Sequence, residues 1–394
     1  MIGILALCTR ESGGVCQYTQ VLIETLVRFT KYEYLIIKNK AFVVPALPEN
    51  RCRCIEVDGG PSAILTKTKR VVYLEMPALR KYLDVSAGYK AIDCYDDIEL
   101  LINPVPSLAP LYIRKPFITT IHDMQHKHHP EFFTFRERLA RNLIFKHLSR
   151  GAISVVCESE HVKKDLAYFL NIPQSKIRVL QSPPMSNILR CRIDIRKKEE
   201  IKRKYRLGDC FFFYPAQFWP HKNHTNLIRA LDKIKTRFGQ TANLVLAGSR
   251  SANERNFEDV MAEIRKLKLE ECVKYLGYIS DDEIPYLYAL STALVMPTLF
   301  ESVSIPIWEA FFLGVPVVSS NVCALPQQVG EAGLLFDPDN VDDIADKMYR
   351  IWTDGALRTK LINKGFEKAK NNTLENHAGL WERAIDEALA LVRR

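Results

Sequence analysis

The fold is decided by one stretch of the sequence, residues 293–320, which reads ALVMPTLFESVSIPIWEAFFLGVPVVSS. It opens with a short, continuous apolar run, which is typical of a strand buried on both faces of a parallel sheet. A polar loop follows, a helix is predicted from near Ile305, and a second apolar run at 316–319 completes the pattern. Strand, helix and strand in this order predict a βαβ unit.

The same alternation runs through both halves of the chain. In the first half we predict strands at residues 2–8, 34–37, 54–57, 99–102, 117–121 and 152–157. In the second half we predict strands at residues 211–214, 243–247, 273–276, 293–296 and 316–319. A basic segment at residues 193–207 has the composition of a linker that leads into a short helix.

The predicted fold class is therefore α/β, with two doubly wound Rossmann-like domains. We place the first domain at residues 1–190, the second at 191–370, and a C-terminal helix at 371–394 that packs back toward the first domain. If the two domains face each other, the carboxyl ends of both sheets meet at one cleft, where such sheets bind ligands.

The composition narrows the class of protein. Apolar residues make up 47% of the 394 residues, which excludes wholesale disorder, and no apolar run approaches the ~18 residues of a spanning helix. The apolar run at residues 2–8 lacks a preceding basic region, so we expect no signal peptide. The ten cysteines contain no CxxC pair, which favours reduced, buried thiols in a cytoplasmic protein.

The net charge of +9 is spread over the whole chain. An even distribution favours a small anionic ligand or an anionic membrane surface as the partner, and it disfavours nucleic acid, because no basic module with interleaved aromatic residues is present.

Glu301 and Glu309 are the most specific candidate residues. Glu301 lies in the loop after a predicted strand, and Glu309 lies in the helix that follows. Two carboxylates so placed can accept hydrogen bonds from two hydroxyl groups of one ligand, while the helix N-terminus attracts its phosphates. A spacing of eight residues alone carries no information, and a loop carboxylate beside a solvated helix residue is the simpler alternative.

A second candidate site lies in residues 214–231, YPAQFWPHKNHTNLIRAL. Lys222 stands just before a predicted helix, where a cation can meet a diphosphate held by the helix N-terminus. Arg250, after the next strand, can supply a further cation. For His221 and His224 a capping or packing role is at least as plausible as ligand contact.

The first half offers a glycine loop and several histidines. Gly13 and Gly14, in the loop that begins at Glu11, permit close backbone approach to a ligand, although a plain structural turn is an alternative. His122 follows a strand at the predicted ligand-binding edge. The group His126, His128 and His129 lacks a second set of ligands, so we expect no metal there.

Two further motifs have structural explanations. Ser159 is expected to act first as a helix N-cap. Asp337-Pro338-Asp339 has the form of a metal-binding Asp-x-Asp, but a turn followed by a cap at Asn340 is the preferred interpretation.

Taken with these motifs, the chain resembles the retaining family-4, or group 1, glycosyltransferases, which have two facing Rossmann-like domains (the GT-B architecture). The resemblance implies that Glu301 faces the hydroxyl groups of the donor sugar and that Glu309 holds the ribose. It also implies donor contacts from the loop residues Ser302, Val303 and Ser304. Ser304 stands where the family usually has glycine.

The resemblance assigns roles to the other candidates as well. Lys222 matches a lysine that clamps the donor diphosphate, and Gln217 occupies the position of the usual arginine. Gly13 and Gly14 match a loop near the transferred sugar and phosphate. His122 matches a histidine that lies close to the donor sugar.

The activity implied is retaining transfer of a sugar from a nucleotide-diphosphate donor to a hydroxyl of a glycan or lipid-linked acceptor, without a metal or other cofactor. The string WPHKNH resembles a mannosyltransferase subgroup and favours GDP-mannose, with UDP-linked donors open. The alternatives are a catalytically silent partner subunit and a nucleotide-sugar epimerase of the same architecture.

A basic amphipathic segment at residues 135–150, FRERLARNLIFKHLSR, suggests peripheral contact with an anionic membrane. Leu139, Leu143, Ile144 and Leu148 form its apolar stripe, which we expect to pack on the sheet. The alternative is a core helix with a solvated basic face. We therefore expect a cytoplasmic protein that either stays in solution or rests on the membrane surface.

Overall fold

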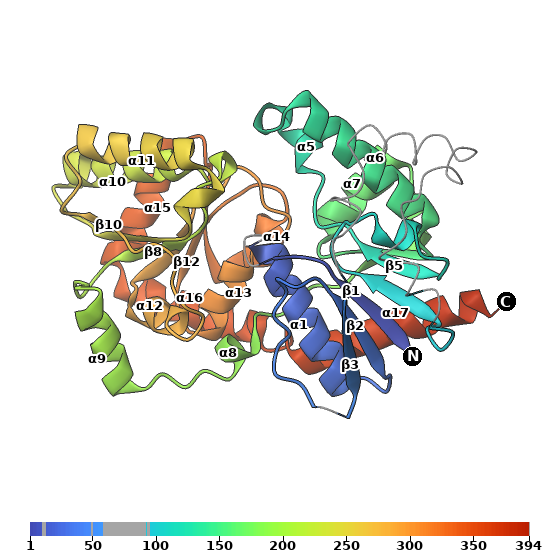
Figure 1. Ribbon diagram of the computed structural model, residues 1–394. Coiled ribbons are helices and arrows are strands. Elements are labelled where there is room, and N and C mark those ends of the chain that lie inside the picture. The colour runs from blue at the N-terminus through green and yellow to red at the C-terminus, as the bar shows by residue number, and fades with distance from the viewer. Residues whose placement is uncertain (10–12, 49, 58–91, 93–94, 394) are drawn as a thin grey trace. The chain divides into compact units, whose positions relative to one another are not determined.

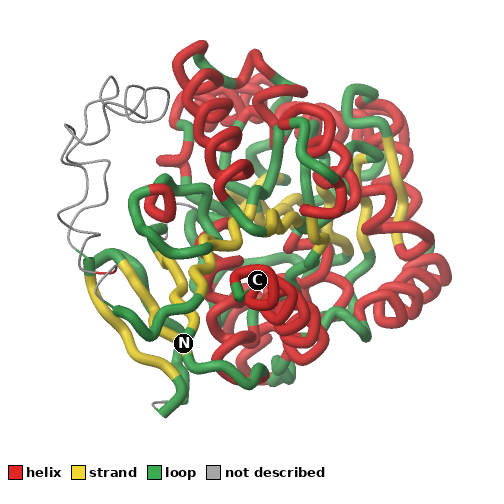
Figure 2. The backbone as a smooth tube through the Cα atoms, turned by 90° about the vertical axis from the view of Figure 1, so that its right-hand side faces the viewer, coloured by secondary structure: helices red, strands yellow, loops and turns green. Residues whose placement is uncertain are grey.

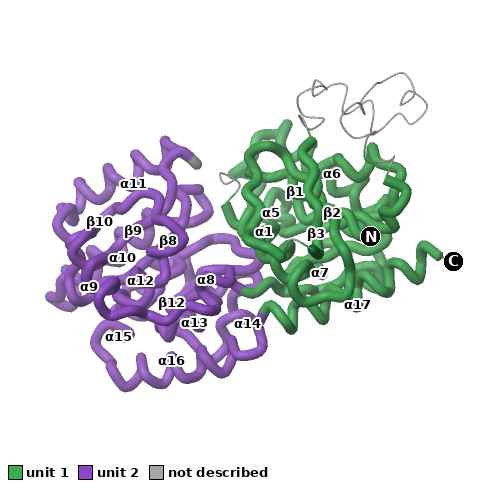
Figure 3. The backbone as a smooth tube through the Cα atoms, turned by 60° about the horizontal axis from the view of Figure 1, so that its bottom comes forward, with its two compact units in different colours: residues 1–183, 374–394 green, residues 184–373 purple. Residues whose placement is uncertain are grey.

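The computed structural model describes residues 1–9, 13–48, 50–57, 92 and 95–393. The chain divides into two compact units, shown separately coloured in Figure 3. Unit 1 comprises Met1–Pro183 and Leu374–Arg394, and unit 2 comprises Pro184–Thr373. The last helix of the chain therefore belongs to the unit that contains the first strand.

Unit 1 is built on a parallel sheet with the strand order β3-β2-β1-β4-β5-β6-β7. Its strands are β1 (Ile2–Ala6), β2 (Tyr34–Lys38), β3 (Cys52–Glu56), β4 (Leu100–Asn103), β5 (Phe117–Thr120), β6 (Ser154–Cys157) and β7 (Ile177–Val179). Its principal helices are α1 (Gly14–Phe29), α5 (Gln125–His128), α6 (Phe135–Gly151), α7 (Glu160–Leu170) and α17 (Leu374–Val392), all labelled in Figure 1.

Alternation along the strands of unit 1 creates two separate apolar layers. Ile4 and Ala6 of β1 face the layer that contains α1 and α17, whereas Leu5 between them faces the layer that contains α6 and α7. In α17, Trp381 is fully buried in the first layer, and its indole N–H donates to His377 Nε2 at 2.8 Å. Burial of this large side chain ties α17 to the unit 1 sheet.

Unit 2 has a second parallel sheet, with the order β10-β9-β8-β11-β12-β13. Its strands are β8 (Phe212–Pro215), β9 (Leu244–Ala247), β10 (Val273–Tyr275), β11 (Ala293–Met296), β12 (Val317–Ser320) and β13 (Gly333–Phe336). Its helices are α8 (Ser186–Leu189), α9 (Ile195–Lys204), α10 (His224–Phe238), α11 (Glu254–Lys266), α12 (Ile284–Leu290), α13 (Ile305–Phe312), α14 (Leu325–Val329), α15 (Val341–Thr353) and α16 (Gly355–Ala369).

The prediction of two doubly wound α/β units is confirmed. In Figure 2 the yellow strands run between red helices, as this class of fold requires. Two short strands, β7 and β13, were not predicted. The basic segment at 193–207 contains the ten-residue helix α9, which Asp194 caps by accepting from the backbone N–H of Lys197.

The strand order marks where ligands bind. In each sheet the order reverses once, between β1 and β4 in unit 1 and between β8 and β11 in unit 2. Doubly wound sheets bind ligands outside the carboxyl ends of their strands at this reversal. No helix among the described residues is long and apolar enough to cross a bilayer.

Candidate active site

Lys222 and Glu301 meet at the reversal point of unit 2. Lys222 ends the connection from β8 to α10, and Glu301 lies in the connection from β11 to α13. The ammonium Nζ of Lys222 donates to Oε2 of Glu301 at 2.5 Å, with 17% and 16% of the two side chains exposed. The structure thus brings together two of the predicted site residues in a partly buried ion pair.

The backbone around Lys222 is fixed by bonds from neighbouring loops. The buried phenol of Tyr214 donates to the carbonyl of Lys222 at 2.8 Å, and the N–H of Leu299 donates to the carbonyl of His221 at 2.7 Å. Asn223 adopts a left-handed conformation with φ 56°, and its side-chain amide donates to the carbonyls of Pro297 and Pro338, both at 2.9 Å. The Lys222 loop is therefore held to the Glu301 loop without any ligand.

The N-terminus of α10 begins directly after this anchored loop. No side chain caps the helix, because the Asn223 amide is turned to the neighbouring loops. Free backbone N–H groups at the first turn of a 15-residue helix present positive charge, and Lys222 precedes them. Together they form a site suited to the phosphates of a ligand.

The loop between Glu301 and α13 is rigid for a different reason. The hydroxyl of Ser304 caps α13 by accepting from the N–H of Ile307, and the Gln328 side chain bonds to both the N–H and the carbonyl of Ser304, at 2.9 and 2.6 Å. Ser304 and Val303 are buried, and Ser302 is half-buried. Gln328 was not predicted, since it lies 24 residues further along the chain.

Glu309 lies within α13 and is almost fully buried, with 6% of the residue exposed. Its Oε2 accepts a hydrogen bond of 2.7 Å from the phenol of Tyr288. Burial raises the pKa of Glu309 to about 7, although the bond from Tyr288 opposes this, and the charge of Asp281 adds to it. In this structure Glu309 therefore pairs with Tyr288, which was not predicted. Among the described residues, Lys222 and Glu301 bond to each other and not to Glu309.

The other predicted donor residues of unit 2 take separate positions. Gln217 accepts a 2.8 Å bond from the indole N–H of Trp219, and Arg250 is exposed at the start of a short 3-10 turn. Gly248, after β9, was not singled out in the sequence. A Cβ atom at this position would lie 2.3 Å from the carbonyl oxygen of Ala216, so only glycine lets β9 approach the start of the Lys222 loop.

His122 lies at the carboxyl end of β5 in unit 1. Its Nδ1 is 3.1 Å from Oε2 of Glu158, which follows the adjacent strand β6, and its Nε2 is 2.9 Å from the carbonyl oxygen of Pro104. Both neighbours are acceptors, so the ring satisfies both bonds only when both nitrogens carry a proton. Burial alone lowers the pKa of His122, but the bond to Glu158 and its charge outweigh burial, and the pKa is raised.

Gly13 is the N-cap residue of α1, with a left-handed φ of 58° that favours glycine. A Cβ at Gly14 would meet no atom of the described residues within 4 Å. Glu11 and the rest of residues 10–12 of the predicted loop lie outside the described residues.

Several structural interpretations of the sequence are confirmed. Ser159 caps α7 by accepting from the N–H of Val162. Asp337 accepts from the N–H of Asp339 within a turn, and Asn340 caps α15. His224 is buried and stacks on Phe218 with ring centroids 4.4 Å apart, and burial lowers its pKa to about 3. These residues shape the loops around the site.

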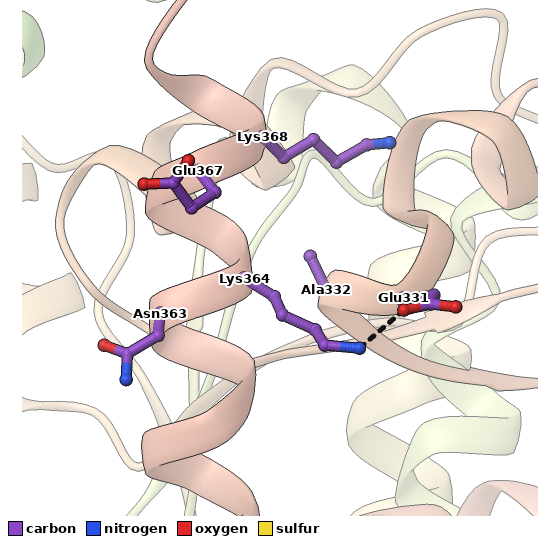
Figure 4. Close-up of a pocket in the computed structure, with 6 residues that line it drawn as sticks. All are labelled: Glu331, Ala332, Asn363, Lys364, Glu367 and Lys368. Carbon is purple, nitrogen blue, oxygen red and sulfur yellow. Dashed lines mark hydrogen bonds and ion pairs between the residues drawn. The ribbon is translucent and has the colours of Figure 1, made fainter.

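A separate open pocket of about 490 Å³ in unit 2 is shown in Figure 4. It lies between α16 and the turn before β13, and it is lined by Glu331, Ala332, Asn363, Lys364, Glu367 and Lys368. Because it adjoins the start of β13, it occupies the amino-terminal edge of the sheet, opposite the edge that carries Lys222 and Glu301. The pocket is therefore not part of the site described above.

Comparison with known proteins indicates the kind of domain that unit 2 contains. Residues 196–368 match the family described as glycosyl transferases group 1. The O-antigen chain mannosyltransferase B of Escherichia coli is 29% identical over 267 residues, which are 66% of this chain and 67% of that protein. A GDP-mannose-dependent alpha-(1-6)-phosphatidylinositol monomannoside mannosyltransferase of Mycobacterium tuberculosis is 27% identical over 190 residues, which are 44% of this chain and 46% of that protein.

Among solved structures, sucrose-phosphate synthase from Thermosynechococcus elongatus has a TM-score of 0.78 at 18% identity, over 99% of this chain and 100% of that one. The shared fold therefore extends over both units. Residues 196–368 of unit 2 match the group 1 glycosyltransferases, and together with the glycosyltransferase relatives this match supports a transferase enzyme. The fold of the chain is the two-unit α/β fold of GT-B architecture.

Proposed function

We propose that the protein is a retaining mannosyltransferase that moves mannose from GDP-mannose to a hydroxyl of a glycan or lipid-linked acceptor. The observation that carries the proposal is the Lys222–Glu301 pair, 2.5 Å apart at the reversal point of the unit 2 sheet and beside the uncapped N-terminus of α10. One side of this arrangement suits phosphates and the other suits sugar hydroxyls.

In the proposed reaction the bond between the anomeric carbon and the β-phosphate oxygen breaks, and GDP leaves with the electron pair. The acceptor oxygen attacks the same face of the anomeric carbon, and its proton passes to the departing phosphate. Lys222 and the N–H groups of α10 stabilise the charge that develops on GDP, so the donor site needs no metal ion. Loss of one such preorganised donor typically costs ~10²–10³ in kcat.

The remaining predicted residues take defined roles in this proposal. Glu301 accepts from the hydroxyl groups of the sugar once the diphosphate engages Lys222. Glu309 accepts from the ribose, with Tyr288 holding the carboxylate. In unit 1 His122, held by Glu158, contacts the sugar only after its Nε2–H leaves the carbonyl of Pro104, and the backbone at Gly14 admits the sugar and phosphate.

The assignment of mannose rests on the relatives and on the WPHKNH string at residues 219–224. The E. coli relative is named as a mannosyltransferase of an O-antigen chain, and the mycobacterial relative as one that depends on GDP-mannose. A glycan or a lipid-linked glycan is the acceptor class that these names support.

The proposal is tested by GDP release from GDP-mannose, with and without a glycolipid extract as acceptor, together with incorporation of labelled mannose. We expect release that depends on the extract and equals the label incorporated. Release without acceptor, accompanied by a changed sugar, would point to an epimerase. No turnover with any acceptor, despite donor binding, would point to a silent partner subunit.

We propose in addition that α6 rests on an anionic membrane. The predicted packing of Leu139 on the sheet is wrong, because 44% of Leu139 and 71% of Phe135 are exposed at the N-terminal end of α6, whereas Leu148 is buried. Both exposed residues stand among arginines, including Arg136 and Arg138. Co-sedimentation should show binding to anionic vesicles that falls as salt rises. Equal binding to neutral and anionic vesicles at low salt would contradict this.

A further inference from the structure

Three potential metal ligands come together in unit 1, on the helices that follow β5 and β6. His128 ends α5, whereas His161 and Asp165 lie on successive turns of α7. One ligand atom from each residue lies within 4.8 Å of the other two. Residues four apart on a helix share one face, so α7 presents its two ligands together toward α5. The second set of ligands that was missing from the sequence pattern is thus supplied by α7.

The separations suit a small tetrahedral ion. His128 Nε2 is hydrogen-bonded to Asp165 Oδ2 at 2.7 Å, a bond that a bound ion replaces, and His161 Nε2 lies 3.5 Å from the same oxygen. Bonds of ~2.0–2.1 Å in a tetrahedral zinc site place ligand atoms roughly 3.3 Å apart. Because α5 is a single short turn and His128 is exposed, small side-chain movements bring all three atoms to that spacing.

An unsatisfied atom points independently to a ligand. His161 Nε2 is buried and has no hydrogen-bond partner among the described residues, although it faces the carboxylate of Asp165. A buried polar atom without a partner is costly.

We propose that His128, His161 and Asp165 bind a zinc ion, with water as the fourth ligand. Two imidazole nitrogens and one carboxylate oxygen are a ligand set that suits Zn²⁺. The other histidines of the original group are engaged elsewhere, since His126 bonds to Asn142 at 2.9 Å and His129 to Glu131 at 2.9 Å.

The position of the site indicates its role. The connection from β5 carries His122 and then α5, and the connection from β6 carries Glu158 and then α7. An ion shared by α5 and α7 therefore ties together the two connections that form the His122–Glu158 pair. The ion acts as a structural brace in unit 1, whereas Lys222 and Glu301 lie in unit 2.

The test is a titration of the metal-free full-length protein with Co²⁺, followed by displacement with Zn²⁺. We expect one equivalent of Co²⁺ to give the intense visible d–d absorption of a four-coordinate ion, and Zn²⁺ to abolish it. His161→Ala should weaken binding by more than about 100-fold, since loss of an outer-sphere partner alone costs ~10–100-fold. The matched control, His129→Gln, should bind as the wild type does.

Circular dichroism of the metal-free variants establishes that they fold. His161 is 28% exposed, so its replacement by alanine is better tolerated than a change at the buried Asp165. The proposal would be overturned if His161→Ala bound Co²⁺ as tightly as wild type, or if His129→Gln lost as much Co²⁺ affinity as His161→Ala. Absorption typical of a six-coordinate ion would also overturn it.

Discussion

Replacement of Glu309 by glutamine should stabilise the protein above neutral pH and weaken donor binding. Glu309 is 6% exposed, and burial raises its pKa from the ordinary 4.5 to about 7. An acid with a raised pKa stabilises the folded state below its unfolded pKa, and this contribution is lost as the pH rises through the folded pKa. The shift corresponds to about 3 kcal/mol at most above pH ~7, where the charged carboxylate is buried at a cost. The uncharged amide of Glu309→Gln avoids that cost.

The assay is the thermal midpoint of wild type and Glu309→Gln between pH ~4.5 and ~8.5. The two should agree at the acid end, where both side chains are neutral, and the variant should gain several degrees at the alkaline end. The control is Glu331→Gln, because Glu331 is an 88% exposed carboxylate that pairs with Lys364 at 2.6 Å on the opposite edge of the same sheet. No pH-dependent gain is expected there.

Donor affinity supplies the other half of this prediction. If Glu309 accepts from the ribose, its loss should weaken GDP-mannose binding by about 10–100-fold, in line with ~1.5–3 kcal/mol for a hydrogen bond to a charged group. The effect should fall on Kd more than on kcat, since ribose contacts are alike in the ground and transition states. A variant that is less stable than wild type above pH ~7, or that binds donor equally well, would refute the reasoning.

Three other variants or conditions test the remaining groups. Glu301→Gln should lower kcat by ~10²–10³ yet leave GDP affinity intact or tighter, because the sugar loses its acceptor while Lys222 loses its competing partner; wild-type turnover would contradict this. Glu158→Gln should lower the thermal midpoint most below pH ~6.5, where His122 is protonated and has lost its carboxylate partner. The difference from wild type should shrink as the pH rises through the raised pKa of His122. A difference that does not change with pH would argue against a protonated His122. EDTA should leave the transfer rate unchanged in His161→Ala, which lacks the proposed zinc site, because Lys222 and α10 bind the donor phosphates without a metal. A loss of rate that Mg²⁺ or Mn²⁺ restores would contradict this.

The strands and loops of the site could be predicted because parallel sheets impose a readable pattern. Buried strands such as β8 and β11 are continuous apolar runs, and the residues after them must lie at one edge of the sheet. Lys222 and Glu301 could be singled out on that basis. β7 and β13 escaped prediction although equally short strands were predicted, because Arg178 interrupts β7 and β13 opens with a glycine and is mostly half-buried.

Partners from distant parts of the sequence could not be predicted. Glu158 faces His122 because β6 lies beside β5, and Gln328 braces Ser304 across 24 residues. The surroundings of Glu309 could not be predicted either, because a glutamate in an amphipathic helix can face either solvent or the core. Only the structure shows that it is buried against Tyr288, and that burial changes the expected effect of its removal.

The central claim is that Lys222 and α10 hold the diphosphate of GDP-mannose, and calorimetric titration tests it most directly. Wild type and Lys222→Met are titrated with GDP-mannose, UDP-glucose and UDP-N-acetylglucosamine. We predict that wild type binds GDP-mannose at least about tenfold more tightly than either UDP-sugar, and that Lys222→Met loses at least about 1.4 kcal/mol of that binding. Tighter binding of a UDP-sugar would contradict the donor assignment, and undiminished binding by Lys222→Met would contradict the site itself.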